Sequence, residues 1–168
     1  MDIRQLTYGC EIIATTGNTN VQITSICDDS RKVVPGSAFV AVKGFASDGH
    51  TYIATAIGKG ACAIVCEDMV MARSQAAQAG AEGITLVQVG SSRHALAIIA
   101  ANFYDNPSEK LTVIGITGTK GKTTTTYMVR SILEKSGFKT GLIGTIETII
   151  GKKVIKGTYA LESAFKGD

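Results

Sequence analysis

Long apolar runs are missing from this 168-residue sequence. No stretch approaches the ~18 consecutive apolar residues of a membrane-spanning helix. The first ten residues include Asp2 and Arg4 and lack the apolar centre of a secretory signal peptide. These absences predict a cytoplasmic protein with no membrane partner.

A concentrated positive charge is also missing. The net charge is only +3, and the lysines and arginines are scattered singly, without the basic stripe of a nucleic-acid-binding surface. We therefore expect no nucleic-acid partner. The sequence contains no internal repeat and no low-complexity segment, and its 45% hydrophobic and 18% charged residues are typical of a folded globular chain.

Residues of the kind that bind zinc are few, with four cysteines and two histidines. Cys62 and Cys66 stand four residues apart in an apolar run, so both are expected on one face of a strand, and a zinc site remains an alternative. Buried free thiols are the favoured interpretation, because only His50 and His94 are available as histidine ligands. For His50, at a helix start, we expect a structural hydrogen bond; His94 is expected to pack or to face solvent.

Short apolar runs alternate with amphipathic stretches from about residue 37. Runs rich in β-branched residues predict strands, and apolar residues at helical spacing followed by glycine or Asn-Pro predict helices. The expected strands are residues 38–42, 61–66 and 84–89, and the expected helices are residues 51–60, 69–80 and 91–106. This order predicts a small α/β domain with helices packed on a parallel or mixed sheet. Residues 1–31 are expected to form short strands around an Asn/Gly turn.

A polar segment at residues 106–110, "NPSEK", is interpreted as a linker. It predicts an amino-terminal domain of residues 1–108 and a second domain from residue 109 to residue 168. The second domain is expected to be the beginning of a doubly wound, phosphate-binding α/β domain that is truncated at residue 168. Its expected elements are a strand at residues 110–117 buried on both faces, a helix that ends near Gly137, a strand at residues 140–146 and a hairpin that turns at Gly151-Lys152.

The segment "GITGTKGKTTTT", residues 115–126, has the composition of a phosphate-binding loop. Glycines let backbone N–H groups converge on an oxyanion, and the start of the following helix adds partial positive charge. Lys122 is expected to reach the β- and γ-phosphates, and the Thr123 hydroxyl is expected to bind Mg²⁺. Lys120 is expected either to contact phosphate or to be solvated.

The strict spacing of such loops, G-x-x-x-x-G-K-[ST], is not met, because Ile116 stands five residues before Gly121. A glycine loop can also cap a helix and expose a lysine without binding any ligand. The predicted strand before the loop, the two loop glycines and the Gly-Lys-Thr triplet together favour phosphate binding over that alternative.

The stretch "GTKGKTT", residues 118–124, resembles the loop of the Mur ligase family, the ATP-dependent enzymes of peptidoglycan synthesis and cell wall biogenesis, although many members have Asn at the place of Lys120. The stretch at residues 29–67 is similar to the amino-terminal domain of one branch, the UDP-N-acetylmuramoyl-tripeptide synthetases. Its distinctive parts are Asp-Ser-Arg at residue 29, a Pro-Gly turn before "FVAV", and Asp-Gly-His at residue 48.

This resemblance implies the ligands of each domain. The amino-terminal domain is expected to hold the uridine diphosphate of the substrate, with Ser30, Phe45, Ala46 and Ser47 in contact with it. Without the resemblance, Asp-Ser-Arg at residue 29 is a turn with a surface ion pair. The second domain is expected to hold ATP and Mg²⁺. Its implied ATP-binding residues are Gly118, Thr119, Lys120, Gly121, Lys122, Thr123 and Thr124, with Lys122 as the catalytic residue and Thr123 as the metal ligand.

The implied reaction adds the third amino acid to UDP-N-acetylmuramoyl-L-alanyl-D-glutamate through an acyl phosphate. Relatives carry Asn-Thr-Thr-Pro-Glu-Ser where this chain has "TYALES", residues 158–163, and further catalytic elements of the family are not found. We therefore expect a fragment of the ligase that is inactive alone. Alternatives are a non-catalytic module that binds a UDP-sugar or nucleotide, and another ligase with this loop, such as a folylpolyglutamate synthetase. The sequence leaves the added amino acid open between diaminopimelate and lysine.

Overall fold

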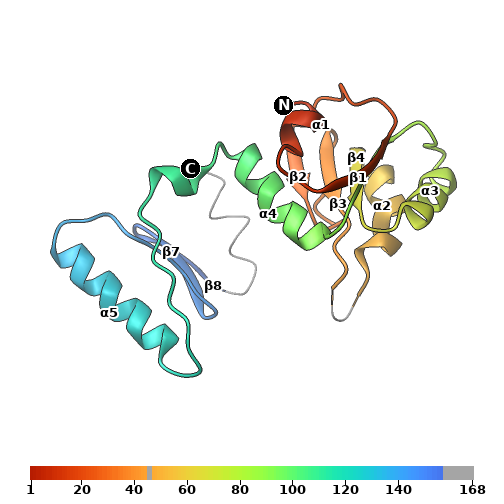
Figure 1. The fold of residues 1–168 in the computed structure, drawn as a ribbon. Coiled ribbons are helices and arrows are strands. Elements are labelled where there is room, and N and C mark those ends of the chain that lie inside the picture. The colour runs from red at the N-terminus through yellow and green to blue at the C-terminus, as the bar shows by residue number, and fades with distance from the viewer. Residues whose placement is uncertain (45–46, 157–168) are drawn as a thin grey trace. The chain divides into compact units, whose positions relative to one another are not determined.

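The computed structural model describes residues 1–44 and 47–156, drawn in colour in Figure 1. The chain divides into a first unit, Met1–Leu111, and a second unit that begins at Thr112. The polar segment before this division forms a short 3-10 helix, η2, at Pro107–Lys110. Within the described ranges, no helix is long and apolar enough to cross a membrane.

A five-stranded sheet forms the centre of the first unit (Figure 1). Its strands stand in the order β1-β5-β4-β3-β2; β2 to β5 run parallel, and β1 pairs antiparallel with β5 at one edge. The strands are β1 Ile12–Thr16, β2 Ser25–Cys27, β3 Ser37–Val40, β4 Ala61–Cys66 and β5 Thr85–Val89. The prediction of a mixed sheet is confirmed.

Helices pack on both faces of the sheet, and alternate strand residues therefore belong to two different apolar cores. Phe39 and Ile64 belong to a core with α2 and α3, whereas the next residues along the strands, Val40 and Val65, belong to a core with α1 and α4. The helices are α1 Ile3–Leu6, the 3-10 helix η1 Gly49–Tyr52, α2 Ile53–Gly58, α3 Met69–Gln78 and α4 Ser92–Phe103. The expected helices are therefore present, and the Ser91 side chain caps α4 by accepting the backbone N–H of His94.

The prediction that Cys62 and Cys66 share a face of β4 is wrong. Ser37 of β3 pairs with Ala61 and the next residue, Ala38, pairs with Ala63, so Cys62 is an extra residue in β4. This bulge reverses the alternation of side chains. Cys66 lies in the core with α2 and α3, and Cys62 packs against the other core.

The four cysteines are free thiols. Burial raises the pKa of the Cys66 thiol to about 12. Among the described residues, no group of three or more His, Cys, Asp or Glu side chains is placed to hold a metal ion. The zinc alternative therefore has no support in the described part of the chain.

The described part of the second unit, residues 112–156, contains one helix and a three-stranded antiparallel sheet in the order β6-β7-β8. Its elements are α5 Lys122–Lys135, β6 Gly141–Ile143, β7 Glu147–Ile150 and β8 Lys153–Lys156. Ile150 pairs with Lys153, and Gly151 has a φ of +55°, which confirms the predicted hairpin turn. Gly137 follows the end of α5 with a φ of +86°, as expected of a helix stop.

The strand expected at residues 110–117 is absent from the structure. None of the described strands pairs with this segment, and its apolar side chains are exposed, with Leu111 at 68% and Val113 at 72%. A strand buried on both faces needs hydrogen-bonding neighbours and covering helices. The described part of the second unit supplies neither to this segment, so its composition alone does not make it a strand.

Candidate functional site

The glycine loop of the second unit takes a backbone conformation that other residues rarely adopt. Gly118 has a φ of +146° and Gly121 a φ of +79°. Gly121 stands at the start of α5, where no side chain caps the helix and no acidic residue lies in the first turn. The N–H groups and partial positive charge of this helix start are therefore available to an anion.

Lys122 lies over this loop. Its Nζ donates to the carbonyl oxygen of Gly118 at 2.6 Å, so the ammonium group is held on the loop at the start of α5. A cavity of about 190 Å³ adjoins it, and Lys122 and Thr123 both line this cavity. The other predicted loop residues are exposed but are not among the residues that line it: Gly118, Thr119, Lys120, Gly121 and Thr124.

Four further polar residues of this cavity were not predicted as site residues: Thr126, Tyr127, Thr145 and Glu147. The Tyr127 hydroxyl donates to the Glu147 carboxylate, which raises the pKa of Tyr127. Tyr127 stands four residues after Thr123 on the same helix face, a spacing that could have indicated it. Glu147 comes from β7, and no local pattern connects it to the loop.

The oxygen groups of this cavity fit a magnesium ion. The Thr123 hydroxyl and the Glu147 carboxylate line the same space, and Mg²⁺ binds oxygen ligands while it retains several waters. Thr123 is the residue predicted for this role, and Glu147, whose carboxylate accepts from Tyr127, is the acidic residue among those that line the cavity.

A second set of polar residues gathers at the carboxyl edge of the sheet in the first unit. Because β2 to β5 are parallel, the segments that follow each strand meet at this edge. Ser30 follows β2 and Ser47 follows the neighbouring β3, so the topology places both predicted residues at one edge. Phe45 and Ala46 lie outside the described residues.

Ser30 is only 8% exposed, inside a turn that its two neighbours hold. The Arg31 guanidinium donates to both carboxylate oxygens of Asp29, with Nη2 2.8 Å from Oδ2. This side-chain hydrogen bond is the main cause that lowers the pKa of Asp29 to about 2. The turn and the ion pair expected for this segment are therefore both present. The Asp29–Arg31 contact holds the backbone on either side of Ser30.

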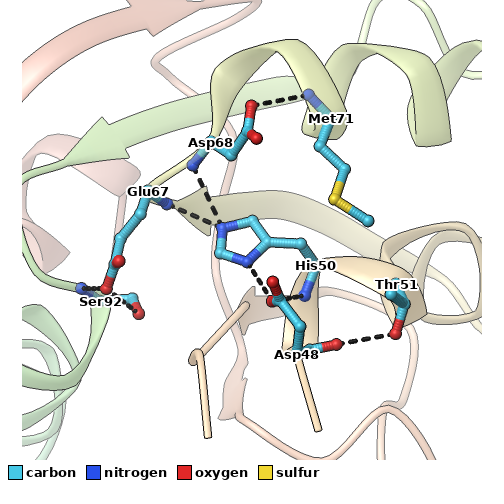
Figure 2. Close-up of polar contacts among 7 residues, drawn as sticks. All are labelled: Asp48, His50, Thr51, Glu67, Asp68, Met71 and Ser92. Atoms are coloured by element: carbon cyan, nitrogen blue, oxygen red, sulfur yellow. Dashed lines mark hydrogen bonds and ion pairs between the residues drawn. The ribbon is translucent and has the colours of Figure 1, made fainter.

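His50 connects two of the segments at this edge (Figure 2). Its ring is 2% exposed, and Nδ1 lies 2.6 Å from Oδ1 of Asp48. Nε2 accepts the backbone N–H groups of Glu67 at 2.9 Å and Asp68 at 3.2 Å. The structural hydrogen bond expected for His50 is therefore present. His94 is exposed, as one of its two expected environments requires.

The helices that start at this edge are already supplied with acceptors. Oδ1 of Asp48 accepts His50 N at the start of η1, and Oδ1 of Asp68 accepts Met71 N at the start of α3. At the start of α4, the Glu67 carboxylate accepts both N and Oγ of Ser92 at 2.7 Å, which lowers the pKa of Glu67. These helix starts therefore offer less to a bound anion than the start of α5 does.

Comparisons with known proteins agree on the family. The model of the Mur ligase family, catalytic domain, matches residues 22–104, and the model of the Mur ligase middle domain matches residues 116–164. The UDP-N-acetylmuramoyl-L-alanyl-D-glutamate--2,6-diaminopimelate ligase of Cytophaga hutchinsonii is 47% identical over 98% of this chain and 32% of its own length. The ligase of the same name from Caldanaerobacter subterraneus is 48% identical over 85% of this chain and 28% of its own length.

The chain thus spans about a third of the length of these curated relatives. Among solved structures, a MurF from Acinetobacter baumannii has a TM-score of 0.50 and 34% identity over 67% of this chain and 22% of its own. The two family models lie in succession along the two units, the first on the parallel sheet and the second on the glycine loop and α5. The chain therefore belongs to the Mur ligase family.

Proposed function

We propose that this chain is the amino-terminal part of a cytoplasmic, ATP-dependent ligase. The proposed reaction joins diaminopimelate to UDP-N-acetylmuramoyl-L-alanyl-D-glutamate, the activity that the names of the relatives state. The observation that carries the proposal is the uncapped start of α5, with Lys122 held over it and Thr123 in the adjoining cavity.

In this proposal the second unit binds the phosphates of ATP. Backbone N–H groups at the start of α5 and the Lys122 ammonium face the same anion, and both stabilise negative charge. To contact phosphate, the Lys122 ammonium group must either break its hydrogen bond to the carbonyl oxygen of Gly118 or donate to that oxygen and to phosphate at the same time. The hydrogen bond of 2.6 Å shows that the side chain has the reach to lie across the loop.

The first unit holds the uridine diphosphate part of the substrate at the carboxyl edge of its sheet. Parallel α/β sheets commonly bind ligands at this edge. The carboxylates that occupy the helix starts leave the turn after β2 and the segment after β3 as the sites for hydrogen bonds to the ligand. Ser30 and Ser47 are the described residues that supply them.

In the proposed reaction, the substrate carboxylate must be activated before an amine can attack it. An oxygen of the substrate carboxylate attacks the γ-phosphorus of ATP, and the bond to the β,γ-bridging oxygen breaks, so that ADP leaves. The amine of the incoming amino acid then attacks the acyl carbon, and inorganic phosphate and a proton leave. Lys122 stabilises the negative charge that develops on the phosphoryl oxygens and on ADP. When bound, Mg²⁺ supplies further charge neutralisation, and Thr123 would hold it.

Two observations favour this proposal over the alternatives. The similarity to diaminopimelate ligases extends through the first unit, and the loop resemblance that suggested a folylpolyglutamate synthetase covers only residues 118–124. A module that binds only a UDP-sugar has no use for the helix start and lysine of the second unit, and a module that binds a nucleotide without turnover is distinguished by the test that follows.

The test uses the full-length ligase and counts the ADP that is released only when UDP-muramoyl dipeptide and diaminopimelate are both present. Lys122→Ala is expected to lower turnover by about 100-fold or more, because a charged group that stabilises the transition state is lost. Lys135→Ala, at the other end of α5, removes the same charge far from the loop and should change turnover less than about twofold. Full turnover in Lys122→Ala would contradict the proposal, and substrate binding without any ADP release in the wild type would favour the non-catalytic module.

A further inference from the structure

The protonation of His50 follows from its contacts. Backbone N–H groups can only donate, so Nε2, which faces those of Glu67 and Asp68, must carry a lone pair and no proton. The ring is therefore protonated at Nδ1, and that N–H donates to Oδ1 of Asp48. Both nitrogens are fully used by the protein, and the ring is buried. His50 thus has no polar atom left for a ligand.

His50 follows two short stretches of chain, residues 41–44 and 47–49, which hydrogen bonds join. Gly44 N donates to Ser47 O at 2.9 Å, and Gly49 N donates to Val42 O at 3.0 Å. Lys43 and Asp48 form an isolated antiparallel bridge between the two stretches. Ser47 is exposed and directly precedes Asp48, so the chain connects its position to that of Asp48.

Asp48 itself is held from two sides. Its Oδ1 accepts the backbone N–H of His50 at 2.9 Å and the ring Nδ1–H at 2.6 Å. The other side of the ring is fixed to the residues that follow β4 (Figure 2). His50 is therefore a rigid link from the end of β4, through Asp48, to the stretch that carries Ser47.

We propose that His50 is a positioning residue for the substrate site of the first unit. It holds Asp48, and through Asp48 it fixes Ser47 at the carboxyl edge, next to the strand whose turn carries Ser30. This inference rests on the proposed function, which places uridine diphosphate at that edge. A residue that only filled the core would need neither polar contact, whereas here Nε2 binds the residues that follow β4 and Nδ1 binds Asp48.

Two substitutions of His50 separate its contact with Asp48 from its contacts with Glu67 and Asp68. In His50→Asn, the amide nitrogen takes the place of Nδ1 and can still donate to Asp48, but the side chain is too short to accept from Glu67 and Asp68. In His50→Gln, the amide oxygen takes the place of Nε2 and can accept these N–H groups, but the donor to Asp48 is lost. Each variant removes one half of the link and retains the other.

Calorimetry with UDP-N-acetylmuramoyl-L-alanyl-D-glutamate on the 168-residue chain is the measurement, with urea unfolding of each variant as a parallel readout. The Gln variant is expected to bind about tenfold more weakly, because Asp48 keeps its backbone contacts but loses the ring donor that fixes its side chain, and the Asn variant within about threefold of wild type. In the full-length ligase, the Gln variant should raise KM for this substrate and leave KM for ATP unchanged. A merely structural role predicts instead that affinity falls in proportion to stability in both variants.

Asp48 provides a second pair should the His50 variants fail to fold. Asp48→Asn retains an oxygen that accepts from Nδ1–H and should bind within about threefold of wild type, whereas Asp48→Ala breaks the link and should bind about tenfold more weakly. Equal affinities within each pair, or losses that only follow stability, would overturn the inference while the proposed function stands. A folded wild-type chain that does not bind the UDP substrate would overturn the proposed function and this inference with it.

Discussion

Gly49 and Gly58 offer a comparison in which the same substitution should have opposite effects. A Cβ on Gly49 would lie 2.7 Å from both N and O of Val42 and 3.1 Å from C of Ala41, all of them backbone atoms. Gly49 N also donates to Val42 O at 3.0 Å. Gly49→Ala must therefore push the two backbone segments apart and weaken this hydrogen bond. Overpacking of this kind costs about 1–3 kcal/mol and the bond about 1 kcal/mol, so we expect a loss of roughly 2–4 kcal/mol.

Gly58→Ala is the matched control. Gly58 is the last residue of α2, and a Cβ there would meet no atom within 4 Å. Alanine restricts the unfolded chain and favours the helix, so this substitution should stabilise the first unit by up to about 1 kcal/mol. The two variants should therefore differ by roughly 2–5 kcal/mol, the sum of the two opposite effects.

Hydrogen exchange of the β4 amides in increasing urea measures the opening of the first unit by itself, because these amides lie in its central strand. The Gly49→Ala variant should exchange at lower urea than wild type, and the Gly58→Ala variant at equal or higher urea. If Gly49→Ala were as stable as Gly58→Ala, the close approach of Val42 to Gly49 would be wrong. The attachment of residues 47–49, which include Ser47, to Val42 would then be wrong as well.

Three further predictions concern the two units. Ser30→Ala should weaken binding of a UDP-sugar by about 0.5–1.5 kcal/mol, the value of one hydrogen bond, and calorimetry that finds no change would remove Ser30 from the site. The pKa of Glu67 is lowered from 4.5 by its hydrogen bonds from Ser92, so its carboxylate stabilises the fold above about pH 4.5 and this contribution is lost as the pH falls through the folded value. Glu67→Gln should therefore make the free energy of unfolding fall less steeply below pH 4.5, and an unchanged slope in acid titration would refute the role of this bond. The 168-residue chain alone should not catalyse ligation and should exchange amide hydrogens faster after Pro107 than before it, because α5 contains no buried residue; substrate-dependent ADP release or uniform protection would refute this.

The strands of the first unit could be predicted because their sequences match their surroundings. Strands β3, β4 and β5 are buried on both faces, so they appear as continuous apolar runs, and glycines follow the helices between them. The glycine loop could also be predicted from local sequence, because the positive φ angles at positions 118 and 121 favour glycine. Local chemistry therefore identified the elements and located Lys122 and Thr123.

Pairings between distant segments could not be predicted in this way. Residues 1–31 contain two short strands around Gly17-Asn18, as expected, yet β1 and β2 do not pair and lie at opposite edges of the sheet. The bulge at Cys62 depends on the register between β3 and β4, and Glu147 reaches the loop cavity only because β7 returns to it. Residues 110–117 have the composition of a central strand, but the strand would require neighbours that the described residues do not provide.

The helix starts show how one architecture can serve two kinds of ligand contact. In the first unit, Asp48, Asp68 and Glu67 supply acceptors to the starts of η1, α3 and α4, so N–H groups there are already bonded within the protein. In the proposed substrate site, loop side chains therefore make the contacts to the ligand. In the second unit, Gly121 supplies no such acceptor, so the start of α5 remains open to phosphate. Side chains that bind a ligand must be held in position by a rigid neighbouring group. Backbone N–H groups that bind a ligand are positioned by the conformation of the loop, which its glycines allow. The difference explains why the phosphate loop is visible as a short motif in the sequence, whereas the positioning of Ser47 depends on a buried histidine whose two partners come from separate strand ends.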